Sequence, residues 1–259
     1  MSTYWQDRIE KTQSAITNKS QKQIERQLAK YYATSAKRAI KDFEAVYDKL
    51  LATLEEGKQL TPADLYKLDK YWQAQGALRQ ELQRLGEKEI SLLTKYFEIN
   101  FFEVYYSFGL EGVEAFNTID REAAMALING IWVMDGKQWS QRVWDNTERL
   151  AATLNEELVN CLVTGKKTTE LKNALQERFN ISYRRADTLV RTELAHIQTE
   201  AAKQRYKDYG IKEVEVLVDV DKHTCDLCKA LVGKRFPIGS VTPLPVHPNE
   251  RCCLVPVIE

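Results

Sequence analysis

The sequence contains little proline and little glycine, with six Pro and eleven Gly in 259 residues. Both residues interrupt helices, so their scarcity favours long helices and few turns. No run of 18 apolar residues occurs, and the opening stretch MSTYWQDRIEKTQ has no apolar segment of the kind that a secretory signal needs. With 44% hydrophobic and 29% charged residues, we expect a globular, helical protein that is neither exported nor membrane-bound.

The sequence also has no excess of either charge, because 37 Lys and Arg balance 37 Asp and Glu. A protein that binds nucleic acid through bulk charge is normally basic, so any contact with DNA must come from a local patch. Residues 1–50 are the candidate, with ten Lys or Arg against six Asp or Glu, although a solvated helix face explains the same excess. We therefore expect at most weak, non-specific DNA binding.

Signatures of common catalytic classes are missing: the sequence has no P-loop, no G-x-S-x-G and no H-E-x-x-H. We therefore expect that the protein is not an enzyme. Glu193 keeps an alternative open, because the spacing places this carboxylate on the apolar face of a helix, beside Val190 and Ile197. A buried carboxylate needs a partner, so Glu193 is either half of a structural ion pair or a catalytic group.

Apolar residues recur with helical spacing over most of the chain. The pattern predicts helices over about 20–55 and 62–84, with Gly86 breaking the second. An aromatic-rich helix follows, and then helices at 120–134, from Trp139 to about Gly165, at 168–179 and from Ser182 to Gly210. Cys161 falls among apolar residues and is expected to be a small core residue.

The periodicity changes near the end of the chain. Valines alternate from 214 to 220, and KRFPI and CCLVPVIE are further short apolar segments, so three strands are predicted. The expected fold class is mainly α, with long amphipathic helices and a small C-terminal β-rich module (α+β). We divide the chain into a long-helix region at 1–115, a second helical region at 116–210 and the β-rich module at 211–259.

The β-rich module contains four of the five cysteines, arranged as C-x-x-C followed by H-x4-C. Thiols clustered in a reducing compartment more often indicate a metal than a disulfide. Two thiolates from one turn, with a histidine and a cysteine from a second loop, suit tetrahedral structural zinc, so the predicted ligands are Cys225, Cys228, His247 and Cys252. Cys253 would point the other way, and His223 is a substitute ligand. Reduced thiols without metal, or a late disulfide, are the alternatives.

Four segments together resemble one family. YWQDRIEK, DGKQWSQRVWDN, LVRTELAH and DVDKHTCDLCKALVGKRF…PVHPNERC occur in this order in the head morphogenesis, or minor head, proteins of tailed bacteriophages, the phage Mu F-like family. The family's Arg-Thr-Glu motif corresponds here to Arg191, Thr192 and Glu193. Its terminal motif usually reads His-Pro-Asn-Cys-Arg-Cys, and Glu250 stands here where a cysteine is common. Since His247 and Cys252 still complete four ligands, Glu250 is expected to be dispensable for the metal.

The resemblance implies a virion protein rather than an enzyme. Such a protein associates with the portal protein and other head proteins during procapsid assembly, and assists DNA packaging or ejection. It would lie inside the capsid near the portal, after assembly in the host cytoplasm. One alternative is a zinc-ribbon nucleic-acid-binding protein, which needs a basic surface that residues 206–259 lack, with seven Lys or Arg against eight Asp or Glu. A second alternative is an enzyme that uses Glu193.

Overall fold

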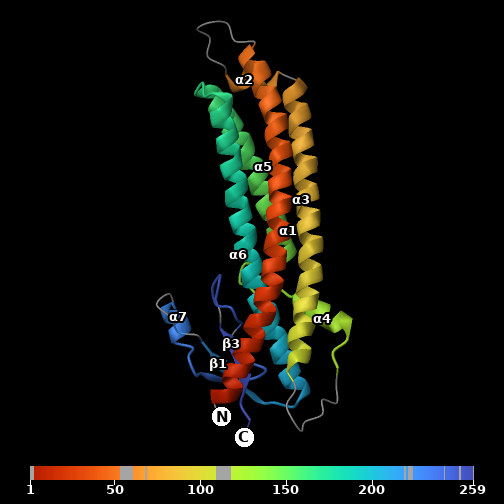
Figure 1. The fold of residues 1–259 in the computed structure, drawn as a ribbon, viewed down its shortest axis with the longest axis vertical. Helices are drawn as coiled ribbons and strands as arrows, with labels where there is room; N and C mark the ends of the chain where they lie inside the picture. Colours follow the sequence, from red (N-terminus) through yellow and green to blue (C-terminus); the bar gives the residue numbers. More distant parts are fainter. Residues whose placement is uncertain are drawn as a thin grey trace. The chain divides into compact units, whose positions relative to one another are not determined.

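The computed structural model describes residues 3–52, 61–67, 69–108, 118–218, 220, 224–241, 243–250 and 252–258, with side chains from residue 8 onward except at position 50. Helices account for most of these residues (Figure 1). They are α1 (Thr3–Ala52), α2 (Pro62–Tyr66), α3 (Asp69–Ser107), α4 (Arg121–Ile128), α5 (Trp139–Val163), α6 (Thr168–Asp208) and α7 (Asp226–Lys229). No helix in this described part of the chain is long and apolar enough to cross a membrane.

Several predicted helix ends are wrong. Helix α1 begins far before residue 20, and α3 continues through Gly86. Gly86 allows close packing inside the helix, since a Cβ there would overlap the ring of Trp144. The segments 168–179 and 182–210 form the single helix α6, because neither Gly nor Pro stands between them. The helix predicted over 120–134 already ends at Ile128.

Other helix ends follow the prediction. Gly165 and Gly210 lie two residues beyond the ends of α5 and α6, with φ of +66° and +72°, a left-handed conformation that glycine adopts at little cost. At the start of α2, the Thr61 backbone N–H donates to Asp64 Oδ2 at 3.0 Å, as in a capping box. These ends are set by local chemistry.

The β-rich module contains a three-stranded antiparallel sheet, so the predicted fold class is confirmed. Its strands are β1 (Glu213–Leu217), β2 (Arg235–Pro237) and β3 (Cys253–Pro256), in the order β2-β1-β3. Val214 pairs with Phe236 on one side and with Pro256 on the other. Val214 and Val216 are buried, as their alternation predicts, although β1 ends at Leu217 and not at Val220.

The chain forms two compact units, each built from segments distant in sequence. Unit 1 comprises residues 1–24, 92–139 and 188–259, and contains α4, α7 and the sheet. Unit 2 comprises residues 25–91 and 140–187, and is helical. Unit 1 draws on all three regions that we divided by sequence, and that division stays a prediction.

Each unit has its own apolar core. In unit 2, Phe43, Leu85 and Phe179 are buried, and Cys161 is fully buried, as predicted. In unit 1, Phe97 from the aromatic-rich part of α3 is buried. Its ring packs edge-on against the Trp139 ring, with centroids 5.2 Å apart. In the same unit, the Tyr206 hydroxyl at the end of α6 donates to the carbonyl of Leu254 in β3 at 3.0 Å, which fixes the sheet against α6.

Candidate metal centre and the Arg-Thr-Glu helix

The short helix α7 positions the first two predicted ligands. Cys225 is the residue before its first turn, and its Sγ accepts a hydrogen bond from the Cys228 backbone N–H at 3.4 Å. This capping arrangement turns both side chains toward the same point. The C-x-x-C spacing therefore acts locally, through a single helical turn, to bring two sulfur atoms together.

His247 reaches the same point from the loop that precedes β3. Its Nε2 lies 3.2 Å from Cys225 Sγ and 3.1 Å from Cys228 Sγ. Its other ring nitrogen, Nδ1, lies 2.9 Å from the carbonyl oxygen of Pro248. A carbonyl can only accept, so Nδ1 carries a hydrogen, and in the neutral ring Nε2 presents a lone pair to the sulfurs. This is the orientation that a metal ligand needs.

The fourth predicted ligand, Cys252, lies near Cys228, which belongs to this group. The ligand atoms of Cys228, Cys252 and Glu250 lie within 4.8 Å of one another, as do those of Cys225, Cys228 and His247. The structure therefore brings together three of the four predicted ligands and joins the fourth to them. It also places beside them Glu250, which was expected to be dispensable for the metal. The substitute ligand His223 lies outside the described residues.

Burial and neighbouring charge shape the protonation of this cluster. The Cys228 backbone N–H lowers the pKa of the Cys225 thiol, whereas burial raises the pKa of Cys228 to about 11. Burial, and then the Glu250 carboxylate, raise the pKa of Cys252. The hydrogen bond to Pro248 raises the pKa of His247. Several groups that become negative on ionisation thus lie close together and would repel one another, and a divalent cation would offset this repulsion.

Glu250 is held firmly in the loop. Its side chain is 6% exposed, and its Oε2 accepts hydrogen bonds from the backbone N–H groups of Val246 and, at 3.3 Å, of His247. Its Oε1 is buried, and none of the described residues donates a hydrogen bond to it. A donor set of thiols, imidazole and a carboxylate with an unpartnered oxygen fits a bound metal ion. All five cysteines are free, which leaves the thiols available for such an ion.

The Arg-Thr-Glu motif lies on α6 in unit 1. Arg191 is exposed, Thr192 donates to the carbonyl of Thr188 at 2.8 Å, and Glu193 is only 1% exposed. The Trp132 Nε1–H donates to Glu193 Oε2 at 3.0 Å. Trp132 lies 61 residues before Glu193 in the sequence, so no local pattern indicates it as the partner.

One helical turn after Glu193, His196 connects α6 to the ligand loop. Its ring stacks on the Trp132 indole, with centroids 4.2 Å apart, and its Nδ1–H donates to the carbonyl of Leu244 at 2.9 Å. Burial lowers the pKa of His196, which keeps the imidazole neutral and suited to this packing. The sequence signal that we overlooked is the i, i+3 spacing of Glu193 and His196 on one helix face.

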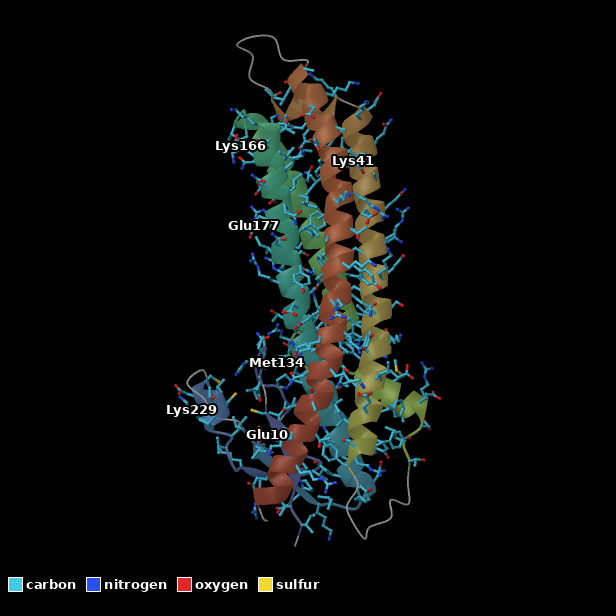
Figure 2. The ribbon with its side chains drawn as sticks, viewed as in Figure 1. Glu10, Lys41, Met134, Lys166, Glu177 and Lys229 are labelled. Atoms are coloured by element: carbon cyan, nitrogen blue, oxygen red, sulfur yellow. The ribbon has the colours of Figure 1, made fainter. Side chains whose placement is uncertain are left out.

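A polar cavity of about 340 Å³ lies beside both features within unit 1. Helix α1 lines it, including Glu10, which Figure 2 labels. Arg191 and Gln198 of α6 line it as well, together with Asn249 and Glu250 of the ligand loop. The first residue of the Arg-Thr-Glu motif and the cysteine-rich loop therefore share one cavity, although they are distant in sequence.

Comparison with known proteins identifies the same region. Residues 152–254 match the family described as "Phage Mu protein F like protein". The match runs from α5 through α6 to β3, and it includes the Arg-Thr-Glu motif and the four predicted ligands. It confirms the resemblance predicted from the sequence, to a phage Mu F-like head morphogenesis protein.

A curated protein from Enterococcus faecalis, the "NAD(+)--arginine ADP-ribosyltransferase EFV", is 28% identical over 126 residues. These residues cover 44% of this chain and 26% of that protein, so the chain spans about a quarter of the length of this relative. No solved structure matches the chain.

Proposed function

We propose that this chain is a minor head protein that binds the portal protein during procapsid assembly and assists DNA packaging or ejection. The observation that carries the proposal is the match of residues 152–254 to the phage Mu F-like family. Other phage head proteins are the partners that this family implies. The portal is the specific partner that we propose, with the mature protein inside the capsid close to it.

An exposed apolar surface supports binding to another protein. On α3, Ile99 is 36% and Tyr106 is 56% exposed, and Phe102 stacks on Tyr106 with ring centroids 5.9 Å apart. We call these three residues the α3 patch. Aromatic side chains that gather on a surface are typical of protein interfaces, because they bury much apolar area at low entropic cost. Glu98 and Glu103 border the patch and supply a polar rim.

Co-expression with portal protein tests the proposal. We expect the two proteins to elute together in size-exclusion chromatography at micromolar concentration and moderate salt. Tyr106→Ser should weaken the complex at least tenfold, whereas Ile131→Ser, at a 59% exposed position outside the patch, should not. Separate elution of the wild-type proteins would overturn portal binding. An unchanged complex with both variants would place the interface elsewhere on the protein.

We further propose that the protein acts by assembly and not by catalysis. Glu193 is almost fully buried and held by Trp132, which supports a structural role for this carboxylate. The similarity to the ADP-ribosyltransferase covers 26% of that protein and does not decide the point. Incubation with NAD⁺ and an arginine-rich protein tests it. Release of nicotinamide that Glu193→Gln abolishes would show that the chain is an enzyme.

We propose zinc as the metal, bound at one ion per chain in a structural role. Thiolate and imidazole donors in a small β-rich module suit zinc, and the module is too small to rely on apolar burial alone. When bound, the ion would tie α7 to the ligand loop. Elemental analysis of protein purified without chelator should find about one zinc per chain. Protein that contains no metal, and whose C-terminal module resists proteolysis equally well with chelator, would contradict this.

A further inference from the structure

The ligand cluster offers two candidates for the fourth donor to the metal. Cys225, Cys228 and His247 form one group, and both remaining donors approach this group through Cys228. The sequence pattern favours Cys252, because it repeats the thiol chemistry of C-x-x-C. The structure places a carboxylate oxygen of Glu250 within 4.8 Å of the Cys228 sulfur as well.

The two candidates differ in what burial costs them. A thiol can be buried as a small, neutral, apolar group at little cost, and Cys252, directly before β3, is 8% exposed. A carboxylate cannot be buried cheaply unless each oxygen finds a donor or a cation. Glu250 Oε2 has two backbone donors, but Oε1 has none among the described residues. A cation beside Oε1 would offset the cost of burying this oxygen.

The loop also favours Glu250. The same carboxylate that presents Oε1 accepts the backbone N–H of His247 through Oε2, so the imidazole and the carboxylate are held together on one short turn. Two donors fixed by one turn are preorganised for one ion, as Cys225 and Cys228 are on α7. Cys252 lies outside this turn, directly before β3.

We infer that Glu250 completes the metal site, with Cys225, Cys228 and His247 as the other three ligands and Cys252 as a buried neutral thiol beside it. The inference depends on the metal that we propose, and is independent of portal binding. It replaces a three-thiolate site with a site of two sulfurs, one nitrogen and one carboxylate oxygen. Zinc accepts such a set, at distances of about 2.3 Å to sulfur and about 2.0–2.2 Å to nitrogen or oxygen.

X-ray absorption spectroscopy on the zinc-loaded wild-type protein tests the ligand set directly. We expect two sulfur and two nitrogen or oxygen scatterers. Three sulfurs and one nitrogen would overturn the inference, and so would a wild-type protein that binds no zinc. This measurement needs no variant, so it decides the question even where a substitution disturbs folding.

Competition with a chromophoric chelator tests the individual residues. Glu250→Gln should weaken zinc binding about tenfold or more, because the amide can still accept from the two backbone N–H groups but is a poor metal ligand. Cys252→Ser should bind zinc within about twofold of wild type, because Cys252 is not a ligand in the proposed set. Glu213→Gln removes an exposed carboxylate from β1 and controls for the lost charge. Normal zinc binding by Glu250→Gln, with loss in Cys252→Ser, would show that the thiol is the ligand.

Discussion

Glu89 provides the sharpest test of the packing inside unit 2. This carboxylate on α3 is fully buried, and the Tyr32 hydroxyl of α1 donates to its Oε2 at 3.0 Å. Asn146 of α5 donates to the Tyr32 oxygen and to the carbonyl of Ser182 on α6, both at 3.0 Å. Four helices thus meet at one polar network. Glu89 Oε1 has no hydrogen-bond donor among the described residues.

Burial raises the pKa of Glu89 from 4.5 to about 7, although the hydrogen bond from Tyr32 opposes this shift. Between these two pH values the folded protein keeps a proton that the unfolded chain has lost. The stability contributed by this group is therefore complete below pH 4.5 and is lost as the pH rises through about 7. At about 1.4 kcal/mol per pH unit, the loss amounts to roughly 3 kcal/mol.

Glu89→Gln should remove this pH dependence, because the amide stays neutral. The difference in free energy of unfolding between variant and wild type should shift in favour of the variant by roughly 3 kcal/mol between about pH 5 and pH 8. Urea denaturation followed by far-ultraviolet circular dichroism measures this difference at each pH. Other titrating groups cancel in it, because both proteins share them.

Glu87→Gln is the matched control, since Glu87 lies two residues earlier on α3 and is exposed. Its difference from wild type should be nearly constant over the same pH range. If the difference for Glu89→Gln is also constant, Glu89 does not titrate with a raised pKa. The argument from burial would then be refuted.

Four further predictions follow from the structure. Gly86→Ala should destabilise the protein by about 1–3 kcal/mol, because its Cβ would overlap the Trp144 ring. Gly76→Ala on the same helix has free space for its Cβ and should stabilise the protein by up to about 1 kcal/mol. Thermal denaturation of the two variants measures both changes. Glu193→Gln should lower stability by one to a few kcal/mol in denaturant titrations, since it weakens the contact with Trp132, and a normally folded variant that loses one discrete activity would indicate catalysis instead. A strong chelator should make the C-terminal module sensitive to protease and leave the helical content of the rest of the chain unchanged, as limited proteolysis and circular dichroism would show. DNA should bind weakly, with a log–log salt slope of about −3 to −4 in fluorescence anisotropy, and tight binding that persists at high salt would favour a nucleic-acid-binding module.

The sequence by itself determined the features that depend on neighbouring residues. Helical periodicity predicted a mainly α fold, and Gly165 and Gly210 marked the ends of two helices through their left-handed conformation. The alternation of Val214 and Val216 predicted the central strand. The two sulfurs of C-x-x-C meet because a single turn of α7 joins them. Each of these signals acts within a few residues, so no tertiary contact is needed to read it.

Only the tertiary structure decided the features that depend on partners far along the chain. Gly86 looked like a helix break, but the Trp144 ring from another helix explains why it is glycine. Glu193 needs a partner, and Trp132, which donates to it, lies 61 residues away in the sequence. In the sequence, Glu250 only replaces a cysteine that is common in the family, whereas its burial beside Cys228 makes it a candidate ligand. The cost of burying a polar group depends on what surrounds it, and spacing along the sequence does not record those surroundings.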